Sequence, residues 1–199
     1  LEKFEPFDRV GTGQDKVERV ASNQRLVAPD GKPLTRWSES GKDPAMAAAP
    51  EGTVDPWLKT VTFARGDKPL VRLHYYATHP QSFCCDGRPS ADFVGWARDT
   101  LEEREKVFQV YFTGCAGNVT VGKYNDATAT AREALGNRLL AAMSASAAAT
   151  RYSPASELVW RTVELTLPPR TDRPSRPGAR RLGPFRPSAL EVGQVSILG

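Results

Sequence analysis

The chain has 199 residues, 40% of them hydrophobic and 9% aromatic, which suffices for one sizeable core and predicts one domain or part of one. Its net charge is +4, but the excess arginines lie largely between Arg161 and Arg186 with few aromatics among them, so no nucleic-acid partner is expected. Cys84, Cys85 and Cys115 fit neither a disulfide framework nor a metal knuckle, and they leave the cellular compartment undecided.

Both ends of the sequence have the character of cuts in a longer chain. The first residues, LEKFEPFDRV, are charged and contain no signal peptide and no transmembrane run. A removed export signal, with a periplasmic or secreted location, stays open. The last residues, EVGQVSILG, are apolar and β-branched, which is typical of a strand that stops short.

Composition divides the chain into four stretches. Residues 1–54 are polar and rich in turn signals, which predicts mostly a loop arm. Residues 55–167 carry the alternating and helical patterns of an α/β core. Residues 168–189 are rich in proline and arginine and predict an extended linker, and residues 190–199 predict the truncated strand.

The first part of the core predicts a β-hairpin, because Lys59–Arg65 and Leu70–Thr78 both alternate and are joined by the turn GDKP. A helix is predicted from Ala91 to Glu105 behind Ser90 as N-cap. The alternating apolar positions of the hairpin are Val61 and Phe63 on the first strand and Val71, Leu73, Tyr75 and Ala77 on the second.

The second part of the core begins with Val107–Thr113, a short apolar run that predicts a central strand buried on both faces. A second helix is predicted over Thr130–Met143, with TARE at its start as a capping box. A further strand is predicted over Glu157–Leu167.

The order strand, helix, strand from Leu70 to Thr113 is a βαβ unit, so its two strands are expected to be parallel. Their carboxyl ends then lie at one edge of the sheet, where open α/β folds bind ligands. The predicted fold class is α/β, with a βαβ-containing mixed sheet, flanking helices and only part of a domain present.

His79 leaves the first of these strands just before Pro80. Its imidazole can ligate a metal, act as a base or satisfy a buried hydrogen bond, and spacing alone favours the last because no HxH or HExxH partner is present. His74 lies at an odd separation from His79, so it is expected on the opposite face of the strand as a core or surface residue.

The segment TGCAGNVTVG, from Thr113 to Gly122, leaves the second strand. Its small residues permit backbone N–H groups to approach an anion or a developing oxyanion, and Thr120 would be the hydroxyl beside them. The simpler interpretation is a glycine turn with a satisfied threonine, since GxxG alone is a weak signal. Packing is the expected role of Cys115, and capping of the first helix that of Asp92.

The segments LVRLHYYATHPQSF, DGRPSADFVGWARDTLEE and VYFTGCAGNVTVGKYND resemble the N-terminal catalytic domain of neutral/alkaline non-lysosomal ceramidases, particularly their shorter bacterial relatives. The resemblance implies that His79 is a zinc ligand. It also places Thr120 where the family has its serine nucleophile, with Gly114, Gly117 and Asn118 in the loop that supports an oxyanion.

The chain departs from the family's GDVSPN segment, because it has GNVTVG over residues 117–122. Threonine keeps the hydroxyl but adds a methyl group that hinders attack. The family's other zinc ligands, a further histidine upstream and a glutamate and a tyrosine downstream, have no match here. Since catalytic zinc typically needs three protein ligands, this fragment is expected to bind zinc weakly and to show little or no turnover.

The resemblance implies a zinc-dependent hydrolase of amide (N-acyl) bonds that acts on an N-acyl lipid or on another small amide. The alternative is a non-catalytic domain that keeps the ceramidase fold for binding or for a surface role. The replacement of serine and proline by Thr120 and Val121 makes this alternative credible.

Overall fold

A computed structural model describes residues 4–84, 87–166, 184 and 186–198. The chain forms two compact units, unit 1 over Leu1–Tyr152 and unit 2 over Ser153–Gly199. Most of the predicted linker over residues 168–189 lies outside the described residues. No helix in the described part of the chain has both the length and the apolarity needed to span a bilayer.

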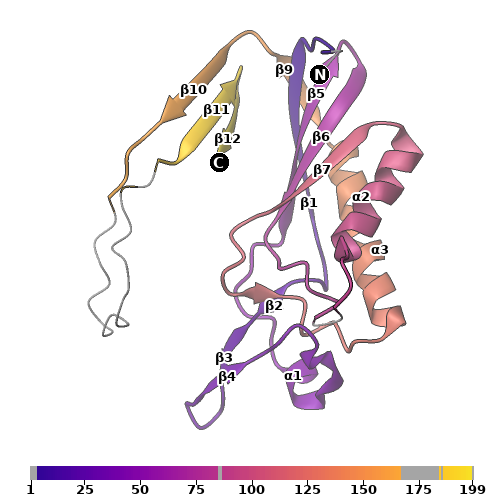
Figure 1. The fold of residues 1–199 in the computed structure, drawn as a ribbon, viewed down its shortest axis with the longest axis vertical. Helices are drawn as coiled ribbons and strands as arrows, with labels where there is room; N and C mark the ends of the chain where they lie inside the picture. Colours follow the sequence, from indigo (N-terminus) through magenta and orange to yellow (C-terminus); the bar gives the residue numbers. More distant parts are fainter. Residues whose placement is uncertain (1–3, 85–86, 167–183, 185, 199) are drawn as a thin grey trace. The chain divides into compact units, whose positions relative to one another are not determined.

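Unit 1 is built on a five-stranded sheet in the order β7-β6-β5-β1-β9 (Figure 1). β1 pairs with β5 and β5 with β6 in antiparallel fashion, whereas β6 and β7 are parallel. The predicted hairpin, the βαβ unit and the mixed α/β fold class are therefore confirmed. The strands are β1 Arg9–Lys16, β5 Trp57–Arg65, β6 Lys68–Tyr76, β7 Phe108–Thr113 and β9 Arg151–Pro154.

Two helices, α2 (Asp92–Glu105) and α3 (Ala129–Ala148), lie side by side along the sheet (Figure 1). α3 begins after Thr128, whose hydroxyl accepts the N–H of Ala131 at 3.1 Å. The predicted capping box two residues later is therefore wrong, because the earlier threonine reaches the free N–H groups of the first turn.

The N-terminal residues contain more structure than the sequence predicts. β1 pairs with β5 along its whole length, although its sequence RVGTGQDK lacks an apolar alternation. Gly13 shows why, since a Cβ there would lie 2.0 Å from the Ser146 carbonyl oxygen of α3. The strand runs directly beneath the helix and has no room for a side chain, so it carries glycine where a pattern search expects an apolar residue.

The rest of this arm is made of short elements beyond the end of the sheet, and the hairpin of β3 and β4 projects from it (Figure 1). β2 pairs with β8, so the arm is tied to the segment after β7. The elements are β2 Ser22–Asn23, β3 Arg25–Val27, β4 Pro33–Thr35, the 3-10 helix η1 Ser40–Lys42, α1 Pro44–Ala48 and β8 Val119–Thr120.

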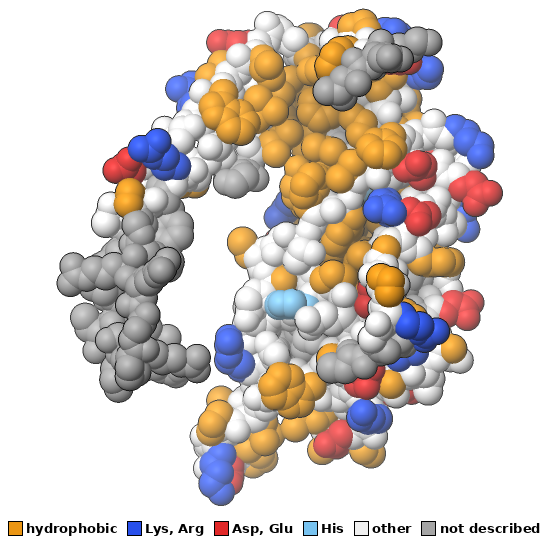
Figure 2. Space-filling view, viewed as in Figure 1, with side chains coloured by type: hydrophobic (Ala, Val, Ile, Leu, Met, Phe, Trp, Pro, Cys, Tyr) orange, Lys and Arg blue, Asp and Glu red, His pale blue; other side chains and the backbone are white. Residues whose placement is uncertain are grey.

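The two faces of the sheet differ in character. The side chains beneath the helices are largely polar and buried, and they include Thr60, Thr62, Arg72, His74 and Gln109. The apolar alternation of the hairpin lies on the other face, where hydrophobic side chains gather over β5, β6 and β7 (Figure 2). Most of that face is half-buried or exposed: Phe63, Val71, Leu73, Tyr75, Phe108, Val110 and Phe112.

β7 is an edge strand and not the predicted central one. Its Phe108 and Phe112 are 61% and 42% exposed. The apolar run predicted burial on both faces, but only the face toward α2 is covered among the described residues. An apolar run alone does not distinguish a strand buried on both faces from one that is covered on a single face.

The hydrophobic core of unit 1 lies between the two helices, the end of the sheet and the segment around β8. Its largest fully buried apolar side chains include Leu58, Tyr76, Leu101, Leu135, Leu139 and Met143. This core therefore packs directly against the loops that follow β6 and β7.

Unit 2 contains a three-stranded antiparallel sheet in the order β10-β11-β12. β10, Leu158–Thr162, confirms the first part of the strand predicted over residues 157–167. The single truncated strand predicted over residues 190–199 is wrong, because β11 (Ser188–Val192) and β12 (Val195–Leu198) form a hairpin that turns at Gly193, whose φ is 56°.

Candidate functional site

Two loops leave unit 1 at the same edge of the sheet. β6 ends at Tyr76 and β7 at Thr113, and these two residues are partners in the parallel register. The N–H of Gly114 donates to the Tyr76 carbonyl at 3.0 Å, so the second loop starts directly beside the first. The prediction that both segments lie at one sheet edge is therefore confirmed.

His79 lies in the first loop and is half-buried. Its Nδ1 is 2.7 Å from the carbonyl oxygen of Val119 in the second loop. Because a carbonyl oxygen only accepts hydrogen bonds, Nδ1 carries the proton, and a neutral ring then leaves the lone pair of Nε2 free. Metal-ligating histidines are commonly oriented in this way, by a hydrogen bond from the second ring nitrogen to a carbonyl group.

Thr120 follows the carbonyl that His79 contacts, and it pairs with Ser22 across β2 and β8. Ser22 Oγ donates to the Thr120 carbonyl at 3.1 Å. The Thr120 side chain accepts the N–H of Gly122 at 3.3 Å, and the residue is only 3% exposed. The hydroxyl is thus held in one direction as an acceptor, while its own proton remains available for donation.

The other three predicted site residues connect the second loop to its surroundings. The Gly114 N–H is bonded to β6, as described above, and the Gly117 carbonyl accepts Arg25 Nη1 at 3.4 Å. Asn118 accepts two N–H groups at 2.9 Å, that of Arg25 on Oδ1 and that of Gln24 on its carbonyl. All three residues therefore help to hold the second loop in position. Their predicted contact with an oxyanion stays a prediction.

Gly122 has a steric reason to be glycine, because a Cβ there would lie 1.8 Å from the carbonyl oxygen of Trp37. The backbone that follows β4 therefore passes directly against the Thr120 loop. The small residues of this segment serve close packing of two backbones at this point and not a left-handed turn, since Gly114, Gly117 and Gly122 all lack a positive φ.

Asp92 has a role that the sequence reasoning missed. It was predicted to cap α2, and its Oδ1 does accept the Phe93 N–H at 2.7 Å. The same carboxylate also accepts the Ser82 hydroxyl and the N–H groups of Ser82 and Phe83, the last two at 2.9 and 3.2 Å. Its φ of 57° is rare for a residue other than glycine. Asp92 therefore anchors the His79 loop to the start of the helix.

Asn125 joins both loops to the arm. Its Nδ2 donates to the carbonyl oxygens of Ser82 and Ser38, at 3.1 and 2.8 Å, and its own carbonyl accepts the Gly41 N–H at 2.9 Å. The residue is fully buried. The only hint in the sequence is an Asn-Asp pair beyond the loop, which predicts a turn and gives no sign of these partners.

A buried arginine and a half-buried lysine hold the arm behind the second loop. Burial lowers the pKa of Arg36, which is fully buried, and Lys123 Nζ donates to the carbonyls of Ala47 and Ala49 at 2.5 Å. The Tyr124 hydroxyl donates to Glu51, and burial together with this carboxylate raises the pKa of Tyr124 to about 12. The acceptors of Arg36 are the carbonyls of Asn23, Met46, Ala49 and Pro50, at 3.0 to 3.2 Å.

The fit of these residues to zinc is partial. His79 presents a free nitrogen, as a ligand requires. Among the described residues, however, no group of three or more His, Cys, Asp or Glu side chains gathers in a way that could hold a metal ion. The described part of the chain thus offers one candidate ligand, His79, and no complete zinc site.

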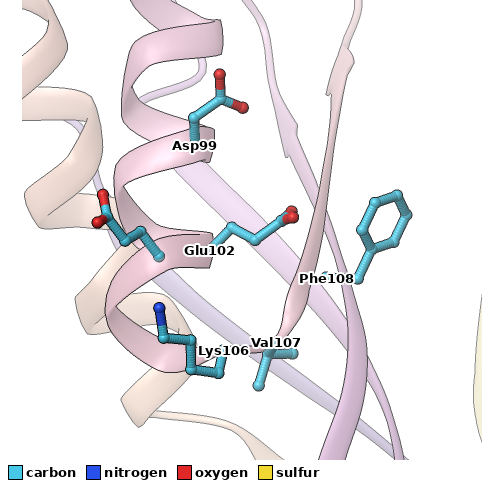
Figure 3. A pocket seen from close by; sticks show the side chains of 6 residues that line it. Asp99, Glu102, Lys106, Val107 and Phe108 are labelled. Carbon is cyan, nitrogen blue, oxygen red and sulfur yellow. The ribbon is translucent and has the colours of Figure 1, made fainter.

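A hollow of about 450 Å³ lies at the other end of β7, between that strand and the last turns of α2 (Figure 3). Its lining combines three carboxylates and the ammonium group of Lys106 with two apolar side chains. β7 begins here and ends at the His79 and Thr120 loops, so the hollow is separate from the candidate site. Its lining residues are Asp99, Glu102, Glu103, Lys106, Val107 and Phe108.

The cysteines give no support to a chelating role. Cys84 and Cys115 are exposed, and Cys85 lies outside the described residues. The packing role predicted for Cys115 is wrong, because the loop after β7 turns outward at this point and leaves the side chain in solvent.

The fold of the chain is similar to that of solved ceramidases. A structure of neutral ceramidase from Pseudomonas aeruginosa gives a TM-score of 0.63 at 15% sequence identity, covering 96% of this chain and 39% of that one. A ceramidase complexed with C2 gives a TM-score of 0.57 at 17% identity, covering 79% of this chain and 25% of that one. The resemblance predicted from the sequence is therefore confirmed at the level of the fold.

At these identities the likeness concerns the fold alone, and this chain spans between one quarter and two fifths of the length of those structures. At the level of sequence, no family model and no curated protein matches the chain.

Proposed function

We propose that the chain forms part of a ceramidase-like hydrolase of amide (N-acyl) bonds. One observation carries the proposal: His79 holds the carbonyl of the residue directly before Thr120, at the carboxyl edge of a parallel strand pair. A potential metal ligand and a potential nucleophile, 41 positions apart in the sequence, thereby share one site. The ceramidase-like fold supports the same reaction class.

In this proposal the Thr120 oxygen attacks the carbonyl carbon of the amide, the C–N bond breaks, and the hydroxyl proton leaves with the departing amine. Water then hydrolyses the resulting threonine ester, which releases the carboxylic acid and restores the hydroxyl. The Gly122 N–H, which donates to this oxygen at 3.3 Å, would fix the direction of the Thr120 hydroxyl during the attack. His79 would be one ligand of a zinc ion whose other ligands lie outside the described residues. When bound, zinc would supply polarisation of the substrate carbonyl.

The substrate class follows from the structural neighbours only by analogy. A ceramidase is named for an N-acyl lipid, and one neighbour is complexed with C2. We therefore propose an N-acyl lipid as substrate, with other small amides as the broader class.

Because the described residues supply one zinc ligand, we propose that the 199-residue chain by itself binds zinc weakly and turns over little or no substrate. Calorimetric titration of zinc into the purified chain tests this directly. A sub-micromolar affinity that His79→Ala abolishes would contradict the proposal of an incomplete site.

The role of Thr120 is tested in the full-length protein with a fluorescent short-chain N-acyl sphingosine. Thr120→Ala is expected to abolish hydrolysis, and Thr120→Ser to raise its rate, since serine lacks the hindering methyl group. Thr12→Ala, at an exposed position of β1, is the matched control. Unchanged hydrolysis in both Thr120→Ala and His79→Ala would remove the enzymatic role of these residues.

A non-catalytic domain is the second candidate, and the burial of Thr120 favours it. A side chain that is 3% exposed and engaged with Gly122 must turn or be uncovered before it meets a substrate. If the full-length protein binds N-acyl lipids, hydrolyses none and gains no activity with Thr120→Ser, the result supports a binding function and contradicts the enzymatic one.

A further inference from the structure

The hairpin of β3 and β4 exposes large apolar side chains next to the candidate site. Val27 is 76% exposed and Trp37, just after β4, is 66% exposed, while Pro33 and Leu34 are also exposed. Val27 and Pro33 are partners across the hairpin and share one face. At this projecting end of unit 1, hydrophobic side chains lie beside charged ones (Figure 2).

Both sides of the hairpin are fastened to the Thr120 loop. On the incoming side the N–H groups of Gln24 and Arg25 bind Asn118. On the outgoing side the Trp37 carbonyl packs on Gly122. Any surface on which the hairpin rests is thereby brought next to the loop that carries Thr120.

The base of the hairpin is rigid. Arg36 lies between β4 and Trp37 and is fully buried. Its guanidinium donates hydrogen bonds to four carbonyl groups of the arm. A rigid base means that the exposed side chains are held in place before any contact, so little ordering entropy opposes docking.

The charges next to the apolar residues are mainly basic. Arg25 and Lys32 are exposed, and Asp30, paired with Lys32 at 2.9 Å, is the acid beside them. Tryptophan together with arginine and lysine at the rim of an apolar surface is the composition that proteins place at the membrane–water interface. The net positive charge is complementary to anionic lipid headgroups.

We propose that this hairpin, from Arg25 to Trp37, docks on a lipid bilayer and presents the His79 and Thr120 site to molecules within it. The choice of a lipid surface over a protein surface rests on the proposed function, because an N-acyl lipid resides in a membrane and must be reached there. The docking itself depends on no chemical step.

Flotation of the 199-residue chain with vesicles tests the proposal. The vesicles consist of phosphatidylcholine alone or with a minority of phosphatidylglycerol. We expect the chain to float with both and to prefer the anionic vesicles. Trp37→Ser is expected to lower the partition coefficient roughly tenfold, because most of the exposed indole leaves the interface.

Arg25→Gln is expected to lower the partition coefficient roughly fivefold on anionic vesicles and to leave it unchanged on neutral ones. Trp160→Ser is the matched control, since this tryptophan of unit 2 is 64% exposed and has no part in the hairpin. Circular dichroism and the thermal midpoint verify that each variant is folded, as expected for exposed positions.

Two results would overturn the docking proposal: a wild-type chain that floats with neither vesicle, or a Trp160→Ser variant that loses as much binding as Trp37→Ser. A hairpin that instead joins two copies would show itself as self-association without lipid that Trp37→Ser removes. Because the vesicles contain no amide substrate for the assay, loss of hydrolysis in the Thr120 variants would not affect this measurement, and the two proposals fail separately.

Discussion

The two faces of the sheet in unit 1 are covered in opposite ways. The face beneath α2 and α3 carries threonine, histidine, arginine and glutamine, and it is buried. The face away from these helices carries phenylalanine, valine, leucine and tyrosine, and much of it remains accessible (Figure 2). Burial of a strand residue in this chain therefore follows the position of the helices and not the hydrophobicity of the side chain.

The buried polar face is held by a connected set of hydrogen bonds. Gln109 Nε2 donates to Glu105 at 3.1 Å, so its Oε1 faces His74 and must accept the Nε2 proton, at 2.8 Å. A neutral His74 then accepts the Thr60 hydroxyl proton on Nδ1 at 2.8 Å, and Thr60 in turn accepts from Ser146 of α3 at 2.6 Å. One tautomer of His74 is thus consistent with the hydrogen bonds of Thr60, Gln109 and Ser146, and the set links both helices to the sheet.

The largest expected effect comes from breaking this set with His74→Leu. The Thr60 hydroxyl and the Gln109 carbonyl then lose their partner while they remain buried, which should lower the free energy of unfolding by about 3 kcal/mol. Urea unfolding followed by circular dichroism measures the change. Leu73→Ala, one residue along on the half-exposed face, is the control and should cost about 1 kcal/mol. Equal costs at the two positions would contradict the difference between the faces.

Low pH should reduce the stability that the buried polar face contributes through His74. Burial lowers the pKa of His74 from 6.5 to about 4; the bond to Gln109 opposes this in part, and the charge of Arg72 adds a smaller lowering. Since the folded-state pKa lies below the unfolded value, the unfolded chain takes up the proton first. The contribution to stability is complete above pH 6.5 and is lost as the pH falls to about 4, at a cost of about 3 kcal/mol.

Unfolding free energies measured across this pH window test that expectation. The His74→Leu variant should show a flatter profile over the same range, because the titrating group is gone. A wild-type profile as flat as that of the variant would show that His74 does not carry the dependence.

Gly13→Ala tests the close contact between the buried face and α3. The added methyl group meets the Ser146 carbonyl oxygen at 2.0 Å, so the helix must move, at a cost of about 2 kcal/mol in unfolding free energy. Gly117→Ala is the matched control in the candidate site, because a Cβ there meets nothing within 4 Å, and it should change stability by roughly 0.5 kcal/mol or less. Thermal unfolding of both variants measures the difference. A similar loss of stability in the two would contradict the steric explanation.

The smallest effect on stability is expected on the accessible face. Phe108→Ser should change the unfolding free energy by about 0.5 kcal/mol or less, because the ring is already 61% exposed. The substitution should lower concentration-dependent self-association in analytical ultracentrifugation, since it removes apolar surface. A large loss of stability would mean that this ring is buried in solution.

The sequence predicted much of the frame of unit 1, and the reasons are local. The alternation on both sides of GDKP specifies the hairpin of β5 and β6, and the helical spacing after Ser90 specifies α2. The strand, helix, strand order then placed His79 and the Thr113–Gly122 segment at one sheet edge, as the bond from His79 to the Val119 carbonyl confirms. The chemical roles of His79 and Thr120 stay predictions.

Contacts between distant segments account for what the sequence missed. β1 could not be found because its Gly13 lies against the backbone of a helix more than 130 positions later. Asp92 looked like a helix cap, and only the folded chain shows Ser82 against its carboxylate. Asn125 likewise has partners in two distant segments, one at Ser82 and one at Ser38 and Gly41.

By itself the sequence determined the elements with regular periodicity, their order and the parallel pairing that follows from that order, because these depend on neighbours along the chain. The tertiary structure alone decided which face of the sheet is buried, that β7 lies at an edge, and that the β3–β4 hairpin is fastened to the Thr120 loop. Each of these depends on where a distant segment packs, and no local pattern of side chains contains that information.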